Sequence, residues 1–155
     1  MPQLILIIGI GNEYRSDDAV GLVVARALQA RKLSGASILE ATGEGIALME
    51  VWKSSDAVIL VDAVASGAPA GTIHQLDVQT SPISPDFFAL STHAFGVAQA
   101  IELARVLGDL PPRLVVYGIE ARRFVAGTGL SPEVERAAHA TVERVARLAQ
   151  SWLQS

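Results

Sequence analysis

The chain has 155 residues, half of them hydrophobic, and a formal net charge of −4 at pH 7. This length suffices for one globular core but not for two ordinary domains, so residues 1–155 are expected to form a single domain. The weak acidity and the lack of a long Lys or Arg run argue against nucleic acid as a partner. With no cysteine, disulfides, a thiol nucleophile and cysteine-ligated metal sites are excluded.

The apolar run at residues 4–8 has no basic residue before it and a glycine-rich turn after it. It predicts a buried strand rather than a signal peptide. No apolar run approaches the ~18 residues that a membrane span requires. A cysteine-free chain fits a reducing compartment, and the sequence predicts a soluble cytoplasmic protein with no membrane partner.

The first half of the chain alternates between strand and helix patterns. Residues 4–10 form a continuous apolar run, as in a strand covered on both faces. Residues 18–30 place apolar side chains on one helical face. Residues 36–40 predict a short strand, residues 45–52 a short helix, and residues 57–64 the most apolar strand of the chain.

The second half continues the alternation. Residues 72–78 alternate apolar and polar side chains, which suits an edge strand. Residues 92–107 predict a helix with a face of small residues, and residues 114–119 a fifth strand. The last helix starts at Ser131, with serine as its N-cap and Pro132 at its first position.

This alternation predicts an α/β fold: a single domain with five strands and helices on both faces of the sheet. In such folds the ligand site lies outside the carboxyl ends of the strands. The rule selects the turn after the first strand, Asp62 at the end of the third, and the loops that lead into nearby helices.

The first turn, GIGNEYRSDDAVG, has the glycines of a phosphate-binding loop but leads into two adjacent carboxylates. A dinucleotide fingerprint, G-x-G-x-x-G, requires a third glycine where Tyr14 stands, and Asp17 and Asp18 would repel a pyrophosphate. A P-loop sequence is absent. The pattern argues against nucleotide binding.

The acidic pair has both a structural and a functional interpretation. Carboxylates in the first turn of a helix are favoured by its dipole, and Ser16 is a candidate N-cap. Adjacent residues on a helical turn point in different directions, so Asp18 can face a cleft while Asp17 caps or faces solvent. The two interpretations stay open at this point.

Asp62 lies inside an apolar strand, where a charge is costly to bury without a partner. A site residue is favoured over a residue that caps the amides of a neighbouring loop. His93 stands at the predicted start of a helix, which also suits a surface or capping residue. The remaining histidines, His74 and His139, are expected to face solvent.

Asp18, Asp62 and His93 lie on three separate segments, and their oxygen and nitrogen donors suit zinc, nickel or another first-row ion. Three ligands would leave coordination positions open. The spacing is not a motif in itself, so this interpretation depends on the fold. A serine nucleophile is disfavoured because no G-x-S-x-G elbow is present.

Four blocks together resemble the hydrogenase maturation endopeptidases, which trim the C-terminal tail of a nickel–iron hydrogenase large-subunit precursor. They are GIGNEYRSDDAVG at residues 9–21, VDAV at 61–64, STHAFG at 91–96 and GIEARRFVAGTGLSPEVERA at 118–137. The blocks occur in the family's order and span nearly the whole chain.

The resemblance implies a phosphorylase/hydrolase-like α/β domain with a twisted, mostly parallel five-stranded sheet. It also implies a monomer that removes the C-terminal extension of a nickel-loaded [NiFe] hydrogenase large-subunit precursor. By position, the family's metal-contacting and catalytic residues fall on Asp18, Asp62 and His93. The nickel would be supplied by the substrate, and zinc or a similar ion would suit the same site. Which of Asp17, Asp18 and Asp62 activates water is left open.

The chain departs from the family pattern at three places, one of which is an extra alanine in the Pro-Gly turn after the Asp62 strand, APAG at residues 68–71. Ala19 replaces a common glycine, and residues 41–45, ATGEG, replace the usual G-G-T-x-G, which bears on partner specificity. Glu44 would also add a carboxylate near the site.

Two alternatives remain. One is a module that binds nickel or the precursor without cleaving. The other is a peptidyl-tRNA hydrolase-like enzyme, although residues 15–21 lack the histidine which that family needs.

Overall fold

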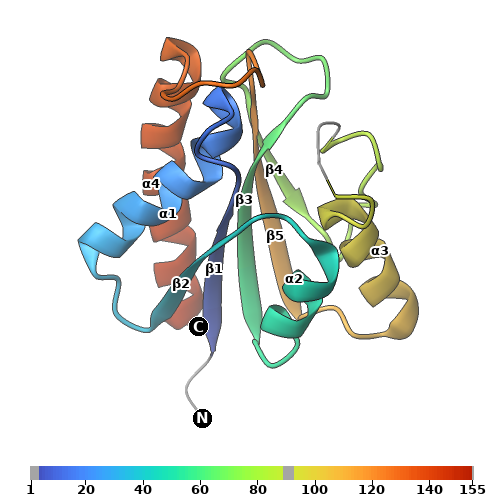
Figure 1. The fold of residues 1–155 in the computed structure, drawn as a ribbon. Coiled ribbons are helices and arrows are strands. Elements are labelled where there is room, and N and C mark those ends of the chain that lie inside the picture. The colour runs from blue at the N-terminus through green and yellow to red at the C-terminus, as the bar shows by residue number, and fades with distance from the viewer. Residues whose placement is uncertain (1–3, 89–92, 155) are drawn as a thin grey trace.

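The computed structural model describes residues 4–88 and 93–154, which form a five-stranded sheet between layers of helices (Figure 1). The strand order is β2-β1-β3-β5-β4, and only β4 runs antiparallel to its neighbour. The strands are Ile5–Ile10 (β1), Ala36–Ala41 (β2), Ala57–Val64 (β3), Ile73–Asp77 (β4) and Arg113–Glu120 (β5). The helices are Val20–Arg31 (α1), Gly45–Trp52 (α2), Val97–Leu107 (α3) and Pro132–Leu153 (α4).

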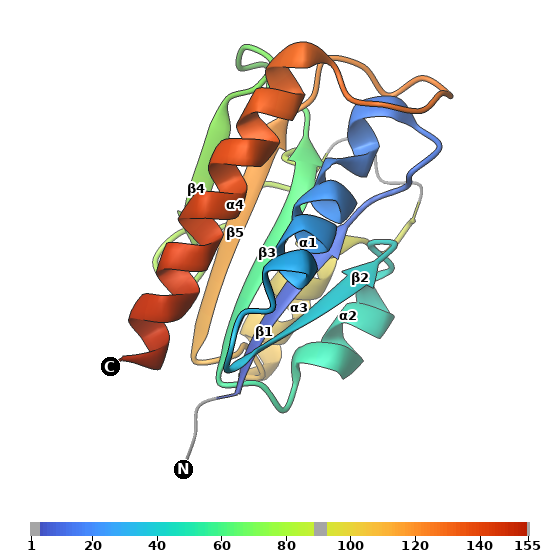
Figure 2. The ribbon, with the colours of Figure 1, turned by 90° about the vertical axis from the view of Figure 1, so that its left-hand side faces the viewer.

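Each face of the sheet has its own hydrophobic core. Helices α1 and α4 cover one face, and α2 and α3 cover the other (Figures 1 and 2). Neighbouring residues of β1 serve opposite cores: Ile7 packs with Val24 and Val142, and Ile8 packs with Leu60 and Ile101. Burial on both faces explains the continuous apolar runs of the central strands. The predicted fold class is confirmed, including the edge position of β4.

The expected helix start at residue 18 is wrong in detail. A 3₁₀ turn, Ser16–Ala19 (η1), precedes α1. Ser16 is not an N-cap, because its hydroxyl donates to the carbonyl of Val125 at 2.8 Å and its N–H donates to the carbonyl of Gly127 at 3.0 Å. Its φ of 53° lies in the left-handed region, which costs a residue other than glycine about 1–3 kcal/mol. The two bonds hold this turn in place.

The helix expected from residue 92 begins at Val97 instead. Gly96 is extended, with φ −105° and ψ −157°, and donates its N–H to the side chain of Gln99 at 3.0 Å. His93 consequently lies in the segment before the helix rather than in its first turn. Ser91 and Thr92 of the STHAFG block lie outside the described residues.

The last helix begins as predicted, with Ser131 at the N-cap and Pro132 first. The Ser131 side chain does not cap it, because the hydroxyl donates to Asp17. Within residues 4–88 and 93–154, no helix is long and apolar enough to cross a membrane.

Two glycines bring α1 close against the sheet. A side-chain carbon on Gly21 would overlap the carbonyl oxygens of Ile10 and Val61, and one on Gly9 would overlap the carbonyl oxygen of Gly21. The glycines of the first turn therefore serve helix–strand packing. Ala19, by contrast, has φ −80° and ψ −5°, a conformation open to any residue, so the backbone there does not require the family's glycine.

Gly21→Ala should lower the free energy of unfolding by about 1–3 kcal/mol or more, because the added methyl group meets rigid backbone. Urea denaturation would measure this. Val23→Ala, on the exposed side of the same helix, should change it by less than about 0.5 kcal/mol. Equal stabilities of the two variants would contradict the close packing.

Candidate functional site

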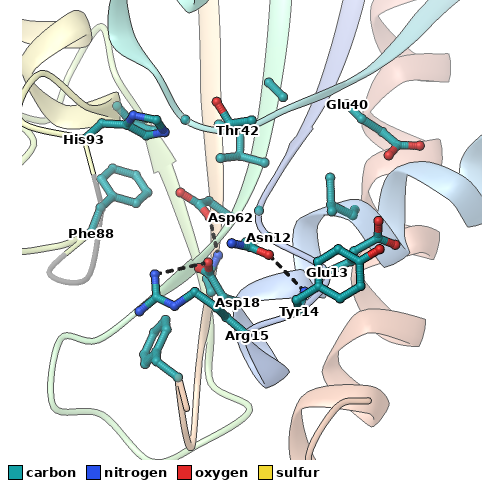
Figure 3. Close-up of a pocket in the computed structure, with 18 of the residues that line it drawn as sticks. Asn12, Glu13, Tyr14, Arg15, Asp18, Glu40, Thr42, Asp62, Phe88 and His93 are labelled. Atoms are coloured by element: carbon teal, nitrogen blue, oxygen red, sulfur yellow. Dashed lines mark hydrogen bonds and ion pairs between the residues drawn. The ribbon is translucent and has the colours of Figure 1, made fainter. Parts of the chain in front are cut away.

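A cavity of about 530 Å³ opens near the carboxyl ends of β1 and β3 (Figure 3). The lining includes the turn after β1, part of α1, the end of β2 with the loop after it, the end of β3, the segment before α3 and Phe124 of the loop after β5. Asp18, Asp62 and His93 all belong to its lining. The structure thus brings the three candidate residues to one cavity, while their roles as ligands or catalysts stay predictions.

Asp62 ends up nearly buried, with 7% of its surface exposed, because β3 is covered on both faces. Its Oδ1 accepts the N–H of Ala63 at 2.8 Å. Burial raises the pKa of Asp62 well above its ordinary value, and the negative charge of Asp18 raises it further. The Ala63 hydrogen bond works in the opposite direction but is the weakest of the three effects.

Asp18 projects from the 3₁₀ turn toward Asp62 (Figure 3). Burial raises the pKa of Asp18, and the positive charge of Arg15 partly offsets this effect. Arg15 Nη1 lies 3.8 Å from Asp18 Oδ2. Burial thus favours the protonated form of both carboxyl groups, most strongly for Asp62.

His93 lines the cavity from the α3 side, across from the two aspartates (Figure 3). The side chain is partly buried. Its ring carbon Cδ2 lies 4.0 Å from where a side-chain carbon on Gly43 would be. The histidine therefore sits beside the β2–α2 loop as well as facing the carboxylates.

The donor types fit a first-row metal ion, since two carboxylates and an imidazole are ligands that such ions accept. Within the described parts of the chain, however, no group of three or more His, Cys, Asp or Glu side chains is arranged to hold a metal. The three residues share a cavity without forming a preassembled metal cluster. An incoming metal would have to bring ligands of its own or draw these side chains together.

Asp17 has a different environment from Asp18. It is fully buried, and both its oxygens accept hydrogen bonds. Oδ1 accepts the Ser131 N–H at 2.7 Å; Oδ2 accepts the N–H groups of Arg122 and Arg123 at 2.9 and 3.1 Å and the Ser131 hydroxyl at 2.8 Å. Asp17 thus anchors the loop before α4 and does not line the cavity.

The cavity also contains residues that the sequence did not single out, among them Arg15, Phe88 and Phe124. Arg15 could have been found, because a cation three residues before Asp18 can face the same side of a helical turn. The two phenylalanines carry no such signal, since their positions depend on how distant loops fold over the sheet end.

Comparison with known proteins assigns the family. A sequence profile described as hydrogenase maturation protease matches residues 22–148. The chain belongs to the hydrogenase maturation protease family. It is therefore a protease, and the nucleotide-binding and peptidyl-tRNA hydrolase interpretations are set aside.

Curated relatives from bacteria agree with this membership. The hydrogenase 2 maturation protease of Escherichia coli is 27% identical over 156 residues, which cover 97% of this chain and 94% of that protein. The hydrogenase expression/formation protein HupD of Thiocapsa roseopersicina is 30% identical over 118 residues, 75% of this chain. The chain matches only 53% of the length of that HupD.

Solved structures share the fold along almost the whole chain. The E. coli hydrogenase maturating endopeptidase HybD has a TM-score of 0.75 at 27% identity, covering 96% of this chain and 94% of that one. A solution structure of an endopeptidase from E. coli has a TM-score of 0.81 at 27% identity, covering 97% and 95%. These matches include the first turn, which the family profile does not reach.

Glu44 is not an additional acid of the maturation protease cavity. Its two carboxylate oxygens accept the N–H groups of Ile46 and Ala47 at 3.0 and 2.8 Å and so cap α2. These amides lower the pKa of Glu44, with a smaller contribution from His93. The expected extra carboxylate thus acts as a helix cap.

His74 does not simply face solvent as expected. Its Nε2 lies 3.1 Å from Oε1 of the buried Glu120 and 3.4 Å from the hydroxyl of Ser66. The Ser66 hydroxyl donates directly to Glu120, so the imidazole does not stand between serine and carboxylate as a triad requires. This cluster ties the loop after β3 to β5. His139 is exposed as predicted.

Asp17→Ala should lower the free energy of unfolding by at least about 3 kcal/mol, because it leaves buried donors without an acceptor. The adjacent Asp18→Asn should change it by less than about 1 kcal/mol. Urea unfolding followed by tryptophan fluorescence would compare them. Similar losses in both variants would contradict the division of roles between the two aspartates.

Asp62→Asn should be at least as stable as the wild type at neutral pH, because folding raises the pKa of Asp62. The unfolded chain loses the Asp62 proton at its ordinary pKa, about 3.9, whereas the folded chain keeps it to a higher pH. The wild type therefore loses stability as pH rises from the pKa of the unfolded state through that of the folded state. The variant lacks this loss, so its advantage should grow as pH rises above about 4. Unfolding measured at several pH values would test this. A pH-independent difference would contradict it.

Proposed function

We propose that this protein removes the C-terminal extension of a [NiFe] hydrogenase large-subunit precursor that already carries nickel. The observation that carries the proposal is the convergence of Asp18, Asp62 and His93 on one cavity in a maturation protease fold. The name of the E. coli relative, hydrogenase 2 maturation protease, supports a hydrogenase precursor as the substrate.

In this proposal the nickel ion is part of the substrate. The two carboxylates and the imidazole would complete its coordination, since their donors suit nickel and also zinc or a similar ion. Binding the metal would fix the tail of the precursor in the cavity with its scissile peptide over the carboxylates. The lack of a preassembled cluster in this chain agrees with a metal that arrives with its own ligands.

The acid pair is suited to receive a cation. Burial and mutual repulsion raise the pKa of Asp62, and burial raises that of Asp18. A nearby cation offsets both effects and favours the ionised carboxylates. One of them would then accept the proton of the attacking water, while the metal polarises the peptide carbonyl. Asp17 is not a candidate for this role, because its oxygens already hold four donors.

This mechanism makes cleavage a checkpoint on metal insertion. A precursor without nickel would leave the two carboxylates repelling each other and would offer no anchor to His93. We also propose that the reaction takes place in the cytoplasm and that the enzyme acts as a monomer. The cysteine-free chain supports a reducing compartment.

The test is intact-mass spectrometry of an unprocessed large subunit incubated with this protein, with and without nickel loading. Loss of a C-terminal peptide only from the nickel-loaded sample is expected. Cleavage of both samples would support the protease activity on this substrate but contradict its dependence on nickel. No cleavage of either, with a precursor that another processing enzyme accepts, would refute this substrate.

Asp18→Asn, Asp62→Asn and His93→Ala should each lower kcat/KM in the same assay by at least about 100-fold. Matched controls are Asp86→Asn and His139→Ala, which change exposed residues outside the cavity. Full activity in all three cavity variants would show that the site is elsewhere.

A further inference from the structure

A second, smaller cavity of about 190 Å³ lies between β2 and α2. Leu39 of β2 and Ala47 and Val51 of α2 give it an apolar lining. Leu39 and Val51 are large hydrophobic residues that leave 41% and 40% of their surfaces exposed. We call this cavity the β2–α2 groove.

The groove borders the cavity that Asp18, Asp62 and His93 line, which we call the catalytic cavity. Glu40, Ala41 and Thr42 line both. A polypeptide held in the catalytic cavity would have to pass only these three residues to reach the groove. A protease must hold its substrate on at least one side of the bond that it cuts. The substrate polypeptide is therefore a candidate to occupy the groove.

The backbone of β2 offers the hydrogen-bonding edge that such an occupant needs. In the described parts of the chain β2 pairs with β1 alone, at one end of the sheet (Figures 1 and 2). Ala41 accepts the N–H of Gly11, at the end of β1, with its carbonyl at 3.0 Å. Because the backbone groups of successive strand residues alternate in direction, Ile38 and Glu40 direct theirs away from β1.

One contact shows this open direction. The carbonyl of Ile38 accepts a long hydrogen bond, 3.4 Å, from the side chain of Gln29. A bond of this length is weak and easily exchanged for a backbone donor. The open edge of β2 thus lies beside an apolar groove that borders the catalytic cavity.

We propose that the groove binds the substrate tail as an added strand along β2, with an apolar side chain of the tail against Leu39 and Val51. This inference rests on the proposed function, because the occupant is the polypeptide that the protease cuts. Strand addition takes its affinity from backbone bonds and its specificity from pockets for alternate side chains.

The geometry also predicts the pattern of the bound segment. Side chains of an added strand alternate between faces, so the neighbours of the apolar residue would face the Arg26–Glu40 ion pair on the α1 side. A strand rises about 3.3 Å per residue, so the apolar residue would lie about three residues from the part of the tail over Thr42.

The test compares Leu39→Asp and Val51→Asp with the control Val106→Asp. Val106 is a hydrophobic residue on α3, 83% exposed and outside both cavities. With nickel-loaded precursor, the two groove variants should raise KM at least about tenfold with little change in kcat, because a charge is placed in an apolar contact. Val106→Asp should behave as the wild type.

Direct binding is measured in parallel, by amide hydrogen exchange of residues 36–42 with and without the precursor. Slower exchange is expected in the wild type on adding precursor, and its loss in Leu39→Asp. Unchanged exchange, or wild-type KM values in both groove variants, would overturn the inference while leaving the protease assignment intact.

The two proposals fail in different ways. A wild type that protects residues 36–42 but does not cut would support the groove and refute the proposed cleavage. A wild type that neither binds nor cuts would refute both. A dimer in solution that Leu39→Asp dissociates would identify the occupant as a second copy of the chain and would refute the substrate assignment.

Discussion

The buried carboxylate of Asp17 holds together the part of the molecule on which the cavity depends. It joins the turn after β1 to the loop before α4 through the amides of Arg122 and Arg123 and both donors of Ser131. The bonds of Ser16 to the carbonyls of Val125 and Gly127 join the turn to the same loop and hold its left-handed backbone. The direction of Asp18, two residues later, is consequently set from a segment more than a hundred residues away.

The two carboxyl groups of the cavity are in an environment that disfavours their charged forms, and a bound cation would offset this. Asp62 is buried close enough to Asp18 for the charge of one to raise the pKa of the other. A folded chain keeps such an arrangement at a cost to its stability, and costs of this kind cluster at functional sites. An anionic ligand would add to the repulsion. The same reasoning argues against phosphate as a ligand of this glycine-rich turn.

The sequence was sufficient for what is encoded locally or by periodicity. Apolar runs located the strands, and a charge inside one of them marked Asp62. It was insufficient where distant segments meet. Nothing local distinguishes Asp17 from Asp18, because the donors that bury Asp17 come from another loop. The start of α3 was misplaced for a related reason: side-chain periodicity continues through Gly96, whereas its backbone is extended.

The segment at residues 41–45 occupies the position from which partner choice would be set. Ala41 and Thr42 border both the cavity of Asp18, Asp62 and His93 and the β2–α2 groove. Gly43 lies beside His93, and Glu44 caps the helix that forms the groove wall. A substitution here can change the path of a bound chain without touching Asp18 or Asp62. The departure of this chain from the family's G-G-T-x-G pattern falls within this segment. Asp18 and Asp62 are held by the 3₁₀ turn and β3, whereas the groove depends on an edge strand and a short helix. Substitutions can therefore alter the groove while leaving the two carboxylates in place.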